Sequence, residues 1–125
     1  MLDILVDSEI QGMRDRAKSG DFDAMIAVVT HMMRGHKTPR NIEKSEQVVR
    51  HIIANKDQVE PHLFWDALCL LAEIQVHQHH DQAADQTALE LVRNMVLAPP
   101  SQWNFSQLFS AVDRIQDGIE SEEIT

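Results

Sequence analysis

The chain has 125 residues, of which 43% are hydrophobic and 25% charged, a composition typical of one globular domain. Four glycines and four prolines supply few turns for an all-β fold, and no apolar run reaches the roughly 18–20 residues of a membrane span. The single cysteine, Cys69, excludes an internal disulfide, and residues 1–7 lack the features of a secretory signal. We therefore expect a cytoplasmic, helical protein.

The formal net charge of −9 comes from the C-terminal half. Residues 1–56 contain nine Lys or Arg and eight Asp or Glu, whereas residues 57–125 contain two and twelve. No basic residue occurs between Lys56 and Arg93, which argues against a nucleic acid or an anionic membrane as the partner of that half. A basic protein would be attracted, although acidic, solvated helix faces are the simpler interpretation.

Apolar residues at steps of three and four predict one helix over about residues 8–19 and a second within residues 19–35. The two stripes are Val6, Ile10, Met13 and Ala17, followed by Phe22, Met25, Ile26, Val29, Met32 and Met33. Asp21 is the expected N-cap of the second helix. Gly20 and Gly35 are expected to end the two helices in the left-handed conformation.

A third helix is predicted from Asn41, its N-cap, to about Asn55. Its inner stripe is Ser45, Val48, Val49 and Ile52. Pro61 fits the first turn of a fourth helix. The apolar residues of that helix cover almost its whole circumference, as in a helix enclosed by neighbours; they are Phe64, Trp65, Ala67, Leu68, Leu70, Leu71, Ile74 and Val76.

A fifth helix, with the stripe Ala84, Ala88, Leu91, Val92 and Met95, is expected to stop before Pro99-Pro100. The absence of Gly and Pro between Pro61 and Pro99 also allows the fourth and fifth helices to be one long helix. A sixth is predicted from Asn104, which pairs with Gln107 as a capping box, to Gly118, with Trp103 packing on Leu108. Residues 1–118 would then form a single helical-repeat domain, and residues 119–125 a flexible acidic tail.

The segment "EQVVRHIIA", residues 46–54, is echoed 43 positions later by "LELVRNMVL", residues 89–97. The same offset aligns Asp23-Ala24 with Asp66-Ala67, so two helices repeat as a pair. Repeats of this length are typical of stacked helical hairpins, in which each unit buries its apolar face against the next. The predicted fold is all-α, with about six antiparallel helices stacked as helical hairpins.

The run "SGDFDAMIAVVTHMMRG", residues 19–35, followed by "TPRNIEKSEQVVRHIIA", residues 38–54, resembles a Sel1-like repeat, a relative of the tetratricopeptide repeats. The positions that match the family are Gly20-Asp21, Ala24, Gly35, Pro39-Arg40-Asn41, Lys44 and Ser45. The match covers about a third of the chain; residues 60–98 keep only the apolar skeleton, and a generic HEAT or armadillo-length repeat is the alternative. The resemblance implies a short α-solenoid that acts as a protein-interaction scaffold or adaptor, as in bacterial and eukaryotic signalling.

Chemistry-bearing residues are few. Glu73, His77 and either His80 or Asp81 would share one face if the fourth helix continued through them, so these four residues are the candidate metal ligands. An inter-helix turn capped by Asp81 is the simpler interpretation. Cys69 is expected to be a buried thiol. The loop 34–40, with Arg34, His36, Lys37 and Arg40, would suit an anion but lacks a phosphate-cradle pattern. The methionines Met13, Met25, Met32 and Met33 form either an adaptable groove or ordinary core.

We therefore expect a non-enzymatic module without a cofactor that binds a protein or peptide. The partner-binding residues predicted by position on the inner helix faces are Asp23, Thr30, Asp66, Glu73 and Asp113. The alternative is a small acidic immunity or antitoxin-like inhibitor that neutralises a basic protein, with Asp66, Glu73, Asp81 and Asp85 as its carboxylates. A metal-dependent enzyme built on the histidine cluster is a third hypothesis.

Overall fold

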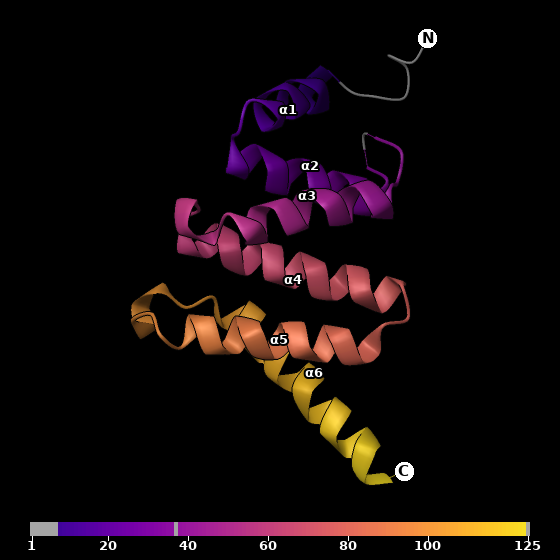
Figure 1. Cartoon of the computed structure of the whole chain (residues 1–125), viewed down its shortest axis with the longest axis vertical. Coiled ribbons are helices and arrows are strands. Elements are labelled where there is room, and N and C mark those ends of the chain that lie inside the picture. Colours follow the sequence, from indigo (N-terminus) through magenta and orange to yellow (C-terminus); the bar gives the residue numbers. More distant parts are fainter. Residues whose placement is uncertain (1–7, 37, 125) are drawn as a thin grey trace. The chain divides into compact units, whose positions relative to one another are not determined.

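The structure is a computed structural model, which describes the backbone of residues 8–36 and 38–124 and the side chains of residues 9–36 and 38–118. These residues form helices and connecting turns, without a strand, which confirms the all-α prediction (Figure 1). The six α-helices are α1 (Ser8–Lys18), α2 (Phe22–Arg34), α3 (Ile42–Ala54), α4 (Pro61–His77), α5 (Asp81–Met95) and α6 (Phe105–Ile124). Two short 3-10 helices, η2 (Lys56–Gln58) and η3 (Pro100–Gln102), follow α3 and α5.

The chain divides into two compact units, Met1–Ala67 and Leu68–Thr125, and the division falls inside α4. In the first unit α1 packs on α2 and α2 packs on α3; in the second, α5 packs on α6. Packing between consecutive helices agrees with the expected helical hairpins. A single domain over residues 1–118 stays a prediction.

Local hydrogen bonds define the ends of the hairpin formed by α2 and α3. The Asp21 carboxylate accepts a hydrogen bond from the Ala24 N–H at 3.1 Å, and the Asn41 side chain accepts one from the Lys44 N–H at 3.0 Å. Both predicted N-caps are confirmed. Gly20 and Gly35 have φ angles of +102° and +66°, the left-handed conformation expected of them.

The sequence left the boundary between α4 and α5 open, and the structure defines it. α4 ends at His77 and α5 begins at Asp81, so the alternative of one long helix is wrong. His79 between them has a φ of +61°, a left-handed turn that a helix cannot contain. The expected cap by Asp81 is also wrong, because the N-cap is His80, whose side chain makes no capping hydrogen bond.

The predicted end of the sixth helix at Gly118 is wrong, because α6 continues to Ile124. The predicted start of α6 agrees with the structure, because Asn104 Oδ1 accepts a hydrogen bond from the Gln107 N–H at 3.0 Å, as an N-cap does. The predicted flexible tail, residues 119–125, has a helical backbone up to residue 124; its side chains and residue 125 lie outside the described residues.

The predicted stripes supply the core of each unit. Fully buried residues in the first unit include Ile10, Val29, Val49 and Ile52, and in the second Ile74, Ala84 and Met95. Met25, Met32 and Met33 are buried, as the core interpretation of the methionines requires, whereas Met13 is half-buried.

One polar pair is buried in the second unit. The Thr87 hydroxyl on α5 lies 2.7 Å from Oε1 of Gln75 on α4, and 3.0 Å from the carbonyl oxygen of Ala83. Both side chains of the pair are buried, and their hydrogen bond joins two helices. A polar atom in such a position must keep a partner, because its water has been removed.

Candidate functional site

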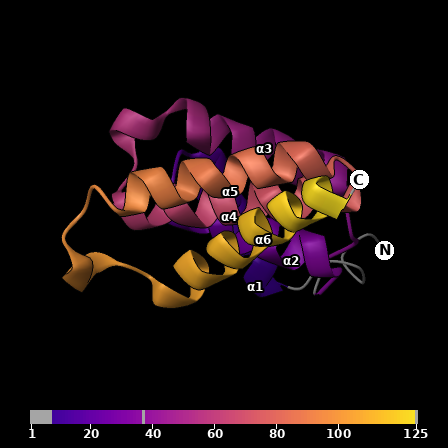
Figure 2. The same cartoon turned by 90° about the horizontal axis from the view of Figure 1, so that it is seen from below.

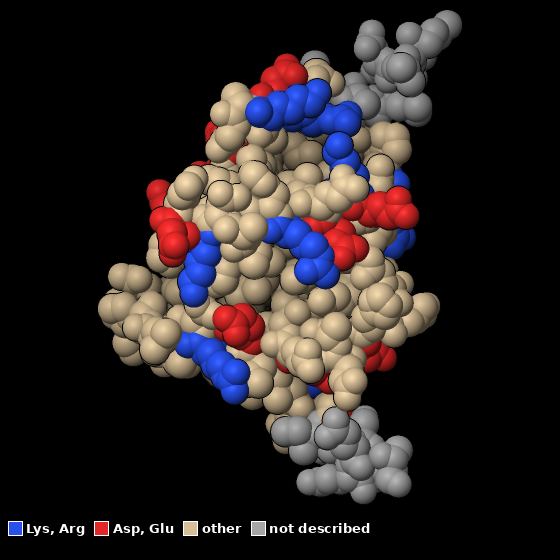
Figure 3. Space-filling view, in the orientation of Figure 1, with Lys and Arg blue, Asp and Glu red and all other residues tan. Residues whose placement is uncertain are grey.

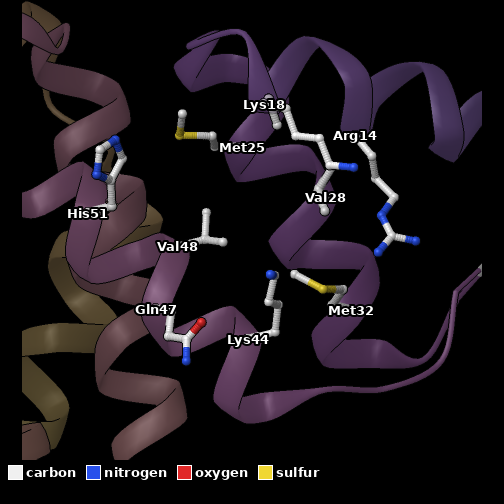
Figure 4. A pocket seen from close by; sticks show the side chains of 10 residues that line it. Arg14, Lys18, Met25, Val28, Met32, Lys44, Gln47, Val48 and His51 are labelled. Atoms are coloured by element: carbon white, nitrogen blue, oxygen red, sulfur yellow. The ribbon is translucent and has the colours of Figure 1, made fainter.

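The three helices of the first unit enclose a groove of about 390 Å³ (Figure 4). Its floor is apolar and consists of Ala17, Met25, Val28, Met32 and Val48. Its rim is polar and mostly basic, and consists of Arg14, Lys18, Lys44, Gln47 and His51. Volumes of roughly 300–1,000 Å³ are typical of binding clefts, so the groove is large enough for a few apolar side chains.

Helical spacing places these residues. Arg14 and Lys18 are four residues apart on α1, so they extend from the same side of that helix. Met25, Val28 and Met32 follow one stripe of α2 and form the floor between the basic groups of α1 and the rim residues of α3 (Figure 4). The groove is therefore a product of three amphipathic stripes.

The α3 side of the groove has the same periodic origin. Lys44, Val48 and His51 follow each other at steps of four and three, which brings a cation, an apolar group and an imidazole to one face. The His51 ring stacks on the Phe22 ring, with centroids 6.3 Å apart, and this contact orients His51 at the rim.

The cations of the rim have no counter-ion among the side chains that the structure describes. Within residues 9–36 and 38–118, no carboxylate forms an ion pair with Arg14, Lys18 or Lys44. By contrast, Arg50 on the same helix as Lys44 pairs with Glu46 at 2.8 Å. Figure 3 shows that Lys and Arg side chains gather over α1. An apolar floor edged by unneutralised cations is suited to an anionic, amphipathic ligand.

The second unit has an acidic recess of about 650 Å³ between α5 and α6. Figure 2 shows α6 crossing α5. Four carboxylates line the recess: Asp81, Asp85, Asp113 and Asp117. One cation is held among them, because Arg114 Nη1 lies 3.0 Å from Asp85 Oδ1. The acidic recess is thus opposite in charge to the groove of the first unit, whose rim is basic.

Gly118 permits the close approach of the two helices at this recess. A Cβ atom at position 118 would lie 2.5 Å from Asp85 Oδ2, closer than real Cβ contacts come. The absence of a side chain therefore lets the Asp85 carboxylate reach Arg114. Gly118 therefore adjoins Asp85 from within α6, which continues past it to Ile124.

The helix preference for alanine over glycine favours Gly118→Ala by about 0.8–1 kcal/mol in the free energy of unfolding. In the wild-type background the gain should be smaller, because the end of the Asp85 side chain must shift from its place beside Arg114. In an Asp85→Ala background the gain should be complete. Urea unfolding of the four chains measures both effects, and an equal gain in both backgrounds would contradict the steric role of Asp85.

The predicted partner-binding residues lie elsewhere than the groove. Asp23 is exposed on α2 and Glu73 is exposed on α4, whereas Asp66 is half-buried on α4. Thr30 is half-buried, and its hydroxyl donates to the Ile26 carbonyl at 2.9 Å. Only Asp113 lines one of the two concavities described above, where it joins Asp81 and Asp85. Binding by these residues stays a prediction.

Sequence reasoning did not find the rim cations of the groove. The sequence pattern assigns Lys44 only to a position of the repeat family and gives Arg14 and Lys18 no role. One feature of the sequence could have indicated them: on α1 and α3 these cations recur with the helical period beside the apolar stripes. This pattern predicts a groove only once it is known that α1, α2 and α3 pack around a common cavity.

The described residues do not bring together a metal site, and they support no chemical role for Cys69 or for the loop 34–40. Among the side chains of residues 9–36 and 38–118, no three His, Cys, Asp or Glu residues are placed to hold a metal ion, so Glu73, His77, His80 and Asp81 do not form a cluster there. Cys69 is half-buried, not fully buried as expected. In the loop 34–40, Lys37 lies outside the described residues, and the His36 ring stacks on His31 with Nδ1 atoms 3.1 Å apart.

Comparisons with protein-family models, with curated proteins and with solved structures found no match. No helix among the described residues has the length and apolar character needed to cross a membrane.

Proposed function

We propose that the chain is a non-enzymatic protein-interaction module of the Sel1-like or tetratricopeptide-like kind, in which the groove of the first unit binds an acidic amphipathic segment of a partner protein. The observation that supports this most is the combination of an apolar floor with three cations that form no ion pair within residues 9–36 and 38–118. The paired helices α2 and α3, with their capped ends, agree with the resemblance to a Sel1-like repeat.

A helical segment suits such a groove because its apolar residues recur at i, i+3, i+4 and i+7 along one face. That face would rest on Met25, Val28 and Val48, and acidic residues beside it would meet Arg14 and Lys44. Thioether side chains adapt to differently shaped apolar partners. The floor would provide affinity, and the rim cations would provide orientation and fast association.

The proposed module works in the cytoplasm, without a cofactor and without catalysis. The charge of this partner is opposite to that of the basic protein that the acidic second half of the sequence would attract. The expectation of a basic partner rests on that half, whereas the groove lies in the first unit and has the opposite sign.

A second candidate function is a small inhibitor that neutralises a basic protein. The acidic recess favours it, because Asp81, Asp85, Asp113 and Asp117 converge there with only Arg114 as a cation. The two candidates predict partners of opposite charge. They also predict different binding surfaces, so one experiment separates them.

The test uses two synthetic helical peptides of about 18 residues with the same leucine stripe, one with glutamates and one with lysines on the polar face. Binding to the full chain is measured by fluorescence anisotropy. We expect the glutamate peptide to bind preferentially, and the double variant Arg14→Glu/Lys44→Glu to weaken it by at least about tenfold. Arg16→Glu/Arg50→Glu, on the same two helices outside the groove, makes the same change in charge; it is the matched control and should leave binding almost unchanged.

Preferential binding of the lysine peptide, reduced by Asp113→Asn/Asp117→Asn, would replace the adaptor proposal by the inhibitor. Equal weakening by Arg16→Glu/Arg50→Glu and by Arg14→Glu/Lys44→Glu would show a non-specific charge effect and contradict the groove. If neither peptide binds the full chain or the variant Phe105→Ser/Phe109→Ser, which lacks the exposed phenylalanines of α6, both candidates are contradicted.

A further inference from the structure

α6 exposes a row of large apolar side chains. Phe105 is 52% exposed, Phe109 61% and Val112 41%. Steps of four and three place all three on one face of the helix. The Phe105 ring lies 6.0 Å from the Phe109 ring and 6.1 Å from the Trp103 ring, so the aromatic groups form a continuous row. We call Phe105, Phe109 and Val112 the α6 stripe.

The α6 stripe is not used for packing within the second unit. α6 packs on α5 and buries Leu108 and Ala111, whereas the neighbouring Phe105, Phe109 and Val112 stay exposed. Arg114 and Gly118 also meet Asp85 on α5 from α6. A row of exposed aromatic residues beside a helix interface that is already satisfied indicates a surface for another chain.

Acidic groups accompany the α6 stripe. Asp113 lies four residues after Phe109, and Asp117 one turn further on, so both lie on the flank of the stripe that borders the acidic recess. Both side chains are exposed. By sequence, α6 carries five acidic residues, Asp113, Asp117, Glu120, Glu122 and Glu123, against one basic residue, Arg114. α6 is therefore an acidic amphipathic helix, the chemistry that suits the groove of the first unit.

We propose that the α6 stripe of one copy docks into the groove of a second copy. This inference rests on the proposed function, because it names an occupant of the same groove. Phe105 and Phe109 would lie on the methionines of the floor, a favourable sulfur–aromatic contact. Asp113 and Asp117 would face Arg14 and Lys44 at the rim.

Charge favours this occupant over a symmetric pairing of two α6 helices. Residues 1–56 carry a net formal charge of +1 and residues 57–125 one of −10, so a contact between unlike halves is attractive. Two α6 helices side by side would instead bring two acidic segments together. Since groove and stripe are different surfaces, the contact is heterologous, and an open assembly of several copies keeps one free groove at one end and one free stripe at the other.

The test is complementation between two full-length variants, followed by sedimentation velocity. The groove variant is Arg14→Glu/Lys44→Glu, and the stripe variant is Phe105→Ser/Phe109→Ser. These residues are exposed except for the half-buried Arg14, so both variants should fold, which circular dichroism and urea unfolding check. We expect the wild-type chain to associate with rising concentration and each variant alone to stay monomeric. An equimolar mixture should form a 1:1 dimer and nothing larger, because it retains one intact groove and one intact stripe.

Other outcomes overturn the inference. A mixture that stays monomeric contradicts heterologous docking. A groove variant that still dimerises by itself, while the stripe variant does not, shows symmetric α6 pairing. A wild-type chain that stays monomeric at every concentration excludes the second copy as occupant; if its stripe variant then binds the glutamate peptide more tightly, α6 of the same chain covers the groove.

The glutamate peptide also separates this inference from the proposed function. The stripe variant has an intact groove without a competing α6 stripe. If it binds the peptide but copies of the chain do not associate, only the inference of a second copy fails. If it does not bind the peptide, the proposed function fails as well.

Discussion

Ile52→Ala should lower the free energy of unfolding by about 2–5 kcal/mol, the usual effect of removing three methyl or methylene groups from a packed core. Ile52 is 0% exposed and lies on the face of α3 that packs in the first unit. The lost apolar burial and the remaining cavity both contribute. Against a typical total stability of about 5–15 kcal/mol this is a large share, and urea unfolding followed by circular dichroism would measure it directly.

Ile53 provides a matched control for this prediction. It is the next residue of the same helix and the same residue type, but its side chain is only half-buried. Ile53→Ala removes the same atoms with the same change in helix propensity, so a clearly smaller loss is expected. Equal losses at both positions would mean that the orientation of α3 described above is incorrect.

Thr87→Val should lower the free energy of unfolding by about 1–3 kcal/mol. The substitution keeps the shape of the side chain and removes the hydroxyl that lies 2.7 Å from Gln75 Oε1. The amide oxygen of Gln75 would then remain in a buried position without this donor, and its desolvation would no longer be compensated. Thermal or urea unfolding measures the loss.

A double substitution tests the reason for that loss. Thr87→Val combined with Gln75→Leu replaces both partners by apolar groups of similar size, so much of the lost stability should return. The two single variants and the double variant form a cycle that isolates the coupling between α4 and α5. Additive losses would show that the hydrogen bond does not couple the two side chains.

Helices and their caps were predictable from the sequence because their causes are local. The cap by Asp21 depends on an N–H three residues away, and the cap by Asn41 has the same spacing. The buried stripe of α3 follows from a 3.6-residue period, so Val49 and Ile52 could be assigned to the core without knowledge of the fold. The echo between α3 and α5 also corresponds to real helices at both places.

The errors arose where the cause lies far away in the sequence. Gly118 matches a helix end by local rules, but its contact is with Asp85 on another helix, and α6 continues past it. The turn at His79 carries no glycine, so no local signal separated α4 from α5. The groove depends on how three helices face each other, which neither the period nor the composition of any one helix contains.

The contact between Gly118 and Asp85 has an evolutionary consequence. A side chain at position 118 and a carboxylate at position 85 compete for the same volume, since a Cβ atom would come within 2.5 Å of Asp85 Oδ2. Asp85 can be shortened while Gly118 is kept, but a larger residue at position 118 requires the end of the Asp85 side chain to move. In an alignment of relatives, the two columns should therefore vary together, with residues larger than glycine at 118 accompanied by a shorter side chain at 85.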